Sequence, residues 1–174
     1  MGLWSRLMAR VGRPDNGHGR TPPPGFLDAL WDQVEADYEK GRDERVLRRV
    51  RSAARRYPRD GEIQLTCGEI FLDYGMFAEA VGPLGRATEL IPDEAYAPAL
   101  LCQAWLERGA LDPAETALAT AEARDPQQAD TLYWRGVMLD LHGAGREALS
   151  YFNAAATAFP DDFFVPYRVS RQRF

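Results

Sequence analysis

Apolar residues recur at helical spacing along most of the chain, in segments separated by short polar breaks. Val46, for example, is followed four positions later by Val50 and three beyond that by Ala53. Residues three and four apart lie on one face of an α-helix, so this spacing predicts helices with one buried stripe. The pattern therefore predicts an all-α chain of helices and turns.

The apolar segments and their breaks define where the helices lie. We expect helices near residues 26–40, 43–57, 60–74, 77–90, 94–108, 111–124, 128–142 and 145–159. Pro98 falls in the first turn of its helix, where its missing N–H group has no cost. Pro83 falls deeper, so we expect it to bend or loosen the helix at 77–90.

Proline and glycine repeat with one period. Each proline of one series lies 34 residues after the previous one, and four glycines form a second column with the same period: Pro58, Pro92, Pro126, Pro160, and Gly41, Gly75, Gly109, Gly143. A glycine suits a turn that needs positive φ, and a proline suits the point where a helix ends. The period therefore predicts four helix–turn–helix units at 25–58, 59–92, 93–126 and 127–160.

Small residues occupy fixed columns of the repeat. The second helices carry Ala80, Ala114 and Ala148 in one column, and the first helices carry Gly68, Cys102 and Gly136 in another. Larger residues follow the second column after three positions: Phe71, Trp105 and Leu139. Small side chains let two helices approach closely while a larger neighbour fills the groove beside them.

These small, aromatic and terminal proline positions resemble the tetratricopeptide repeat family. The resemblance covers residues 26–160 and implies a right-handed α-solenoid of four 34-residue helix–turn–helix repeats with a C-terminal cap. The first unit departs from the pattern, with Val34 where a small residue is usual and Asp37 where an aromatic one is. A skewed first helix would fit this departure. The resemblance also favours a bacterial source.

The two ends differ from the repeats. Residues 1–24 read as a basic tail and flexible linker, in which one helix face carries Leu3, Trp4, Leu7, Met8 and Val11 among arginines. Three interpretations stay open for this tail: a frayed terminus, docking on the repeats or a partner, and weak membrane association. Residues 161–174 carry enough apolar side chains to cap the last hairpin. Whether the natural chain continues beyond Phe174 also stays open.

Composition narrows the function classes. The chain is 45% hydrophobic with a net charge of −5, which allows a packed core and argues against nucleic acid as the main partner. The charge is uneven: the first 59 residues hold 13 Arg and Lys against 8 Asp and Glu. No secretory signal pattern occurs, and both cysteines lie in apolar helical patterns, so we expect a cytoplasmic protein. Its oligomeric state stays open.

Catalytic chemistry has little support in the sequence. The two histidines are His18, in the linker, and His142, at a hairpin turn where we expect contact with helix-end carbonyls. Cys67 and Cys102 are expected to behave as small buried residues. No nucleotide-binding or nucleophile motif occurs. We expect no enzyme activity, no cofactor and no metal.

The resemblance implies that the first helices line a concave groove that binds a peptide or a helix. Acidic and aromatic residues dominate the positions of this sequence that match the groove positions of the family: Trp31, Asp32, Glu35, Glu62, Glu69, Asp73, Tyr96, Gln103, Glu107, Asp130, Tyr133 and Trp134. The basic clamp of the chaperone-binding subgroup is absent, because Trp31, Glu35 and Tyr96 stand at three of its positions. We expect a basic, partly apolar ligand, with residues 1–13 of this chain as one candidate. The alternative is that these acids only solvate the helices.

Arginines crowd the second helix of the first unit. The candidate basic outer patch is Arg45, Arg48, Arg49, Arg55 and Arg56. A solvated face is one interpretation, and a surface for an acidic partner, for anionic lipid or weakly for nucleic acid is another.

The main hypothesis is a non-catalytic peptide-binding adaptor. One alternative is the regulatory or substrate-presenting repeat part of an enzyme, such as a metallopeptidase, with its catalytic domain elsewhere. A purely structural assembly subunit is the third.

Overall fold

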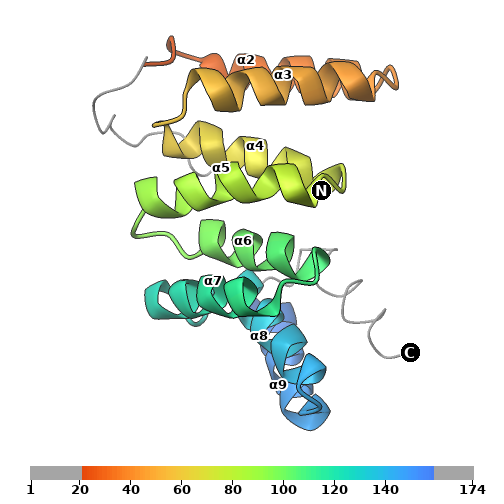
Figure 1. Ribbon diagram of the computed structural model, residues 1–174, viewed down its shortest axis with the longest axis vertical. Coiled ribbons are helices and arrows are strands. Elements are labelled where there is room, and N and C mark those ends of the chain that lie inside the picture. The colour runs from red at the N-terminus through yellow and green to blue at the C-terminus, as the bar shows by residue number, and fades with distance from the viewer. Residues whose placement is uncertain (1–20, 159–174) are drawn as a thin grey trace.

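The computed structural model describes residues 21–158, which fold into a stack of four helical hairpins (Figure 1). The hairpins are α2 (Phe26–Tyr38) with α3 (Asp43–Arg56), α4 (Gly61–Asp73) with α5 (Phe77–Leu90), α6 (Tyr96–Glu107) with α7 (Leu111–Arg124), and α8 (Ala129–Leu141) with α9 (Gly145–Ala158). Within these residues there is no strand. The predicted all-α solenoid is therefore confirmed.

The helix ends follow the proline and glycine columns closely. Every end lies within two residues of its predicted position. The turn glycines have φ of 61° at Gly41, 67° at Gly75, 71° at Gly109 and 80° at Gly143. These angles lie in the left-handed region that favours glycine. The glycines recur at the turns because each turn needs a positive φ, as predicted.

Two of the first helices begin with a side-chain cap. Asp60 accepts a hydrogen bond from the Ile63 backbone N–H at 2.9 Å, and Gln128 accepts one from the Thr131 N–H at 2.8 Å. Each bond satisfies one of the N–H groups that a helix start leaves without an internal partner. These caps fix where α4 and α8 begin.

The small-residue columns mark close helix contacts, as predicted. A Cβ atom added at Gly68 of α4 would lie 2.4 Å from Leu84 Cδ2 of α5. One added at Gly136 of α8 would lie 2.6 Å from Phe152 Cε1 of α9. Each of these two hairpins closes because a glycine faces a large apolar side chain.

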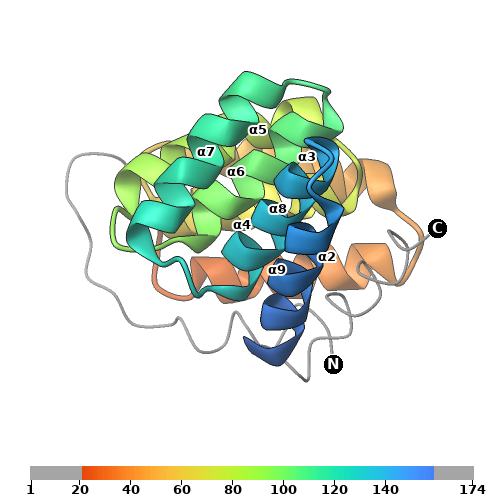
Figure 2. The ribbon, with the colours of Figure 1, turned by 90° about the horizontal axis from the view of Figure 1, so that it is seen from below.

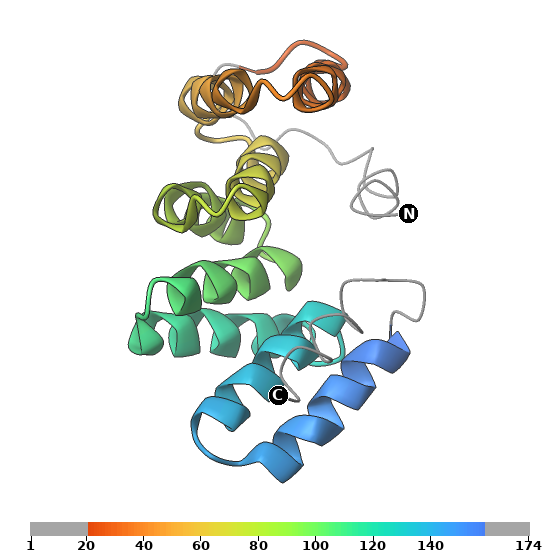
Figure 3. The ribbon, with the colours of Figure 1, turned by 90° about the vertical axis from the view of Figure 1, so that its right-hand side faces the viewer.

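The core forms two clusters along the stack. One extends from Leu30 of α2 to Ala104 of α6, and the other from Ala99 of α6 to Ala155 of α9. Both include residues of α6, so this helix joins the two clusters. Figure 3 shows α2 and α4 on one side of the stack and α3 and α5 on the other. The last hairpin is turned relative to the others, as Figure 1 and the view along the stack in Figure 2 both show.

The two prolines inside helices fit the fold differently. Pro98 lies in the first turn of α6, as predicted. α5 continues through Pro83 from Phe77 to Leu90, and a bend or loosening at this proline stays a prediction. The Pro83 ring is buried, so its packing offsets the backbone hydrogen bond that it removes.

The first unit keeps a regular first helix despite its unusual residues. Asp37 is buried and its carboxylate accepts a hydrogen bond from Arg49 Nε of α3 at 2.8 Å. Arg42 and Arg45 add ion pairs to the same carboxylate at 3.6 and 3.9 Å. An ionic contact with α3 thus replaces the expected aromatic contact, and α2 is not broken or shortened by it.

Several predictions fall on residues 1–20 and 159–174, which lie outside the described part of the chain. They concern the basic tail, Pro160 and the C-terminal cap.

Candidate functional site

The first helices carry a one-sided set of charges. Their sequences contain four carboxylates in α2, three in α4, one in α6 and two in α8. Arg135 of α8 is the only Lys, Arg or His in these four helices. Its Nε lies 2.8 Å from Glu122 Oε1 of α7, so this one cation is directed to the neighbouring second helix.

The predicted groove residues divide into three groups by burial. Four are exposed: Asp32, Glu35, Asp73 and Glu107. Three are half-buried: Trp31, Glu62 and Gln103. Five are buried: Glu69, Tyr96, Asp130, Tyr133 and Trp134.

The aromatic residues of α8 also stabilise the last hairpin. The rings of Tyr133 and Trp134 meet edge to face with centroids 4.9 Å apart. Tyr133 also lies 5.6 Å from the ring of Phe152 in α9. Asp130 accepts a hydrogen bond from Gln128 Nε2 at 2.9 Å, close to the start of α8. The aromatic end of the predicted site is therefore held rigidly by packing and by a helix cap.

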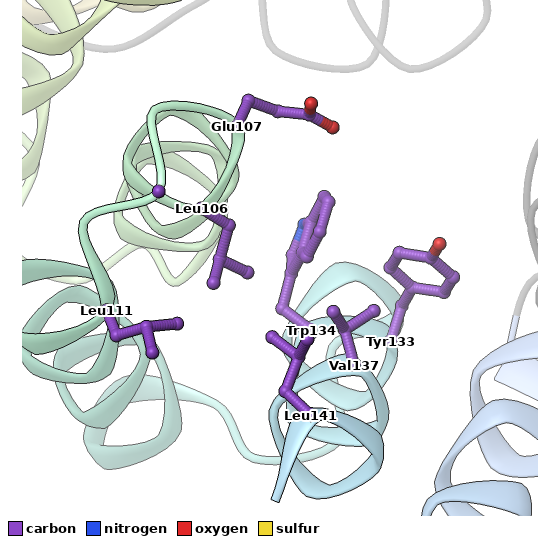
Figure 4. A pocket seen from close by; sticks show the side chains of 8 residues that line it. Leu106, Glu107, Leu111, Tyr133, Trp134, Val137 and Leu141 are labelled. Carbon is purple, nitrogen blue, oxygen red and sulfur yellow. The ribbon is translucent and has the colours of Figure 1, made fainter.

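A pocket of about 430 Å³ lies between α6 and α8 (Figure 4). Leu106 and Leu111 stand on one side of it, and Trp134, Val137 and Leu141 on the other. The Glu107 carboxylate extends above Trp134 at the rim. The pocket brings together three of the predicted residues, which are Glu107, Tyr133 and Trp134.

Five pocket residues were not among the predicted site residues, and two of these five are exposed leucines. Leu111 begins α7 and is 45% exposed, and Leu141 ends α8 and is 57% exposed. Leu141 could have been found, because it occupies the repeat column of Glu39, Asp73 and Glu107 and is the only apolar residue there. Leu111 gave no such signal. Phe77 occupies the same repeat column and packs against the core, so an apolar residue at this position is expected to be a core residue.

The basic outer patch is only partly open. Arg45 and Arg49 point their guanidinium groups at Asp37, and Arg49 also donates to Gln33 Oε1. Arg48, Arg55 and Arg56 are exposed, and the Arg56 guanidinium lies 5.5 Å from the centroid of the Tyr57 ring. Two of the five predicted patch residues thus act within the first hairpin.

The reactive residue types occupy structural positions. Cys67 and Cys102 are fully buried, and burial raises the pKa of each thiol to about 12. The expectation for His142 was wrong: its Nε2 lies 3.3 Å from Glu115 Oε1 of α7, and only its backbone N–H contacts a helix-end carbonyl, that of Met138. The side chain reaches α7 because α7 and α8 pack together.

Residues 21–158 contain no group of three or more His, Cys, Asp and Glu side chains placed to hold a metal ion. No helix among them is long and apolar enough to cross a membrane.

No protein-family model matches the sequence, and no curated protein matches it either. Solved structures do match. A crystal structure of MamA superposes with a TM-score of 0.62 at 22% identity, covering 79% of this chain and 75% of that one. TTC0263, a thermophilic TPR protein of Thermus thermophilus, gives 0.61 at 20% identity and covers 75% and 73%.

YrrB, described as a TPR protein with an unusual peptide-binding site, gives a TM-score of 0.60 at 21% identity, covering 82% of this chain and 73% of that one. These similarities concern the fold, and they agree with the period, the glycine turns and the small-residue contacts described above. The chain therefore has the tetratricopeptide repeat fold.

Proposed function

We propose that this protein is a non-catalytic scaffold whose first-helix face binds a basic, partly apolar peptide segment. The observation that carries the proposal is the charge of these helices: ten carboxylates and a single arginine lie in α2, α4, α6 and α8. Asp37, Glu69 and Asp130 are buried, and the exposed acids include Asp32, Glu35, Asp73 and Glu107. Complementary charge selects partners and speeds their association. A ligand with Arg or Lys side chains fits this face, and an acidic ligand is repelled.

Aromatic side chains on the same helices favour a ligand that is partly apolar. Trp31 of α2 is half-buried, and Tyr133 and Trp134 of α8, although largely buried, line the pocket between α6 and α8. A guanidinium or ammonium group over such a ring gains about 0.5–2 kcal/mol, depending on how much water is excluded. Exposed ion pairs add only about 0.2–1 kcal/mol each, so several contacts must act together.

A peptide with the required character occurs in this chain. Residues 1–13 combine Leu3, Trp4 and Leu7 with Arg6, Arg10 and Arg13. We include self-binding of this segment in the proposal, so that it competes with a partner for the same face. The peptide-binding site named for YrrB, a protein of the same fold, supports a peptide as the kind of ligand.

The test is the affinity of a fluorescent peptide of residues 1–13, measured by anisotropy. The protein is the full chain carrying Trp4→Ser and Leu7→Ser, so that its own segment competes less; we refer to it as the W4S/L7S chain. Adding Asp32→Asn, Glu35→Gln and Asp73→Asn removes three carboxylates of the first helices. We expect binding to weaken about tenfold, because each lost contact is worth a few tenths to one kcal/mol.

The matched control removes charge outside the first helices. Glu44→Gln, Glu89→Gln and Asp93→Asn change exposed residues of the second helices and a turn. These changes should leave the affinity nearly unchanged. The unsubstituted chain should bind the peptide more weakly than the W4S/L7S chain if self-binding occurs. Equal losses in the first-helix and control variants would contradict the proposal.

A further inference from the structure

We propose that the pocket between α6 and α8 anchors one large apolar side chain of a basic amphipathic helix, whose Arg or Lys residues contact carboxylates around the pocket. This inference rests on the proposed function and extends the binding surface from the first helices over the α6–α7 turn. The inference places one apolar side chain of the ligand in the pocket and requires positive charge on the ligand residues close to that side chain.

The lining of the pocket fits an apolar anchor. Leu106, Val137 and the Trp134 ring form its walls, and Leu111 and Leu141 stand at its open side (Figure 4). Its volume of about 430 Å³ leaves room for one large side chain, and the pocket is open to solvent on one side. Covering Leu111 and Leu141 would remove apolar surface from water, which is favourable at about 25 cal/mol per Å².

The surroundings of the pocket carry negative charge. Glu107 lines it directly. Asp112 follows Leu111 in the chain, and both carboxylates belong to exposed residues. The Asp140 carboxylate is directed elsewhere, because it lies 3.4 Å from where a Cβ on Gly145 of α9 would stand. The neighbouring cation, Arg108, lies over the Trp105 ring at 4.7 Å from its centroid. An apolar ligand with cationic neighbours is therefore favoured over a neutral or acidic one.

The arrangement of these carboxylates favours a helical ligand. Glu107 lines the pocket at the end of α6, and Asp112 lies next to the lining residue Leu111 at the start of α7. A helix presents side chains three and four positions before and after an apolar anchor on the same face. It can therefore place cations on several sides of the anchor at once, as residues 1–13 would with Arg6 and Arg10 around Leu7.

The experiment uses the W4S/L7S chain and the fluorescent peptide of residues 1–13. One variant adds Leu111→Ser and Leu141→Ser, which remove the exposed apolar side of the pocket. A second adds Glu107→Lys and Asp112→Lys. We expect each variant to bind the peptide about tenfold more weakly, and the loss in the lysine variant to shrink as salt is raised.

Each variant has a matched control. Leu149→Ser makes the same change at a leucine of α9 that is 42% exposed and lies outside the pocket. Glu89→Lys and Asp93→Lys make the same charge change at other exposed positions. Circular dichroism checks that every variant keeps its helices. The controls should bind as the W4S/L7S chain does.

The outcomes separate this inference from the proposed function. If the pocket variants bind like their controls while Asp32→Asn, Glu35→Gln and Asp73→Asn weaken binding, the anchor is wrong and the first-helix face stands. If only the lysine variant loses affinity, the pocket does not hold an apolar side chain and the inference is also overturned. If the peptide does not bind the W4S/L7S chain, both proposals are overturned.

Discussion

Asp37 occupies the repeat position that holds Phe71, Trp105 and Leu139 in the three later units. A carboxylate so close to the end of α2 faces the unfavourable end of the helix dipole. The hydrogen bond from Arg49, with the charges of Arg45 and Arg42, lowers the pKa of Asp37 below its ordinary value of 3.8. The ionised form is thus held by the folded protein, which links its stability to pH.

Replacing Asp37 with asparagine should destabilise the fold in a pH-dependent way. Because the folded-state pKa is depressed, the carboxylate contributes stability above the ordinary value of 3.8, and this contribution is lost as the pH falls through the folded pKa. We expect Asp37→Asn to lower the urea midpoint of unfolding at neutral pH. The difference in midpoint between this variant and the unsubstituted protein should disappear at acidic pH. Glu35→Gln, an exposed site of the same helix, is the control. A difference that does not change with pH would contradict the ionic role.

The glycines of α4 and α5 have different reasons to be there. Gly68 faces Leu84 so closely that a Cβ would lie 2.4 Å from Leu84 Cδ2, whereas a Cβ on Gly85 meets nothing within 4 Å. Gly68→Ala should lower the free energy of unfolding by about 1–3 kcal/mol, because it overpacks the hairpin. Gly85→Ala should raise it by about 0.5–1 kcal/mol, because alanine is the better helix former. Denaturant unfolding of both variants is the measurement, and equal effects would contradict the close contact at Gly68.

At the scale of elements, consecutive repeats are joined by side chains that reach the end of the preceding second helix. Arg124 of α7 donates from Nη2 to the Thr88 carbonyl at 2.8 Å and from Nη1 to the Glu94 carbonyl at 2.9 Å. Gln64 of α4 has a similar role for α3, since its Nε2 donates to the carbonyls of Ala54 and Tyr57 at 2.8 and 2.9 Å. Both satisfy carbonyls that a helix end leaves without an internal partner.

Removing the guanidinium of Arg124 should weaken the junction between the second and third repeats. We expect Arg124→Met to lower the free energy of unfolding by about 2 kcal/mol, because half-buried carbonyls lose charge-assisted hydrogen bonds while the alkyl packing is kept. Arg146→Met, at an exposed arginine of α9, should change it little. Chemical denaturation compares the two. Equal stability of both variants would show that the junction does not depend on Arg124.

The helix ends were predictable because the glycine and proline residues that mark them act locally. Glycine at positive φ and proline at a helix end act through the backbone of their own turn, so a column of each gives the helix ends directly. Asp37 could not be interpreted in the same way. Its role depends on Arg49 of another helix, and residue spacing within α2 carries no information on that contact.

At the scale of the whole molecule, the first helices are acidic and basic charge is concentrated in α3, whereas α5 and α7 each hold more acids than arginines. The first helices hold one arginine among ten carboxylates, while α3 alone holds six arginines. The acidic charge of the first helices could be read from the sequence, because the repeat assigns each residue to a first or a second helix, but the burial of Glu69, Asp130 and the aromatic residues could not. The pocket was not predictable either, since Leu111 of α7 meets Leu141 of α8 only through the way the third and fourth hairpins stack.

The central claim is that the first-helix face selects a basic, partly apolar peptide. The most direct measurement compares two fluorescent peptides on the W4S/L7S chain at low and high salt: residues 1–13, and the same peptide with Arg6→Glu, Arg10→Glu and Arg13→Glu. The account predicts saturable binding of the basic peptide that weakens with salt, and no binding of the acidic one. Equal binding of both, or binding of the acidic peptide alone, would contradict it.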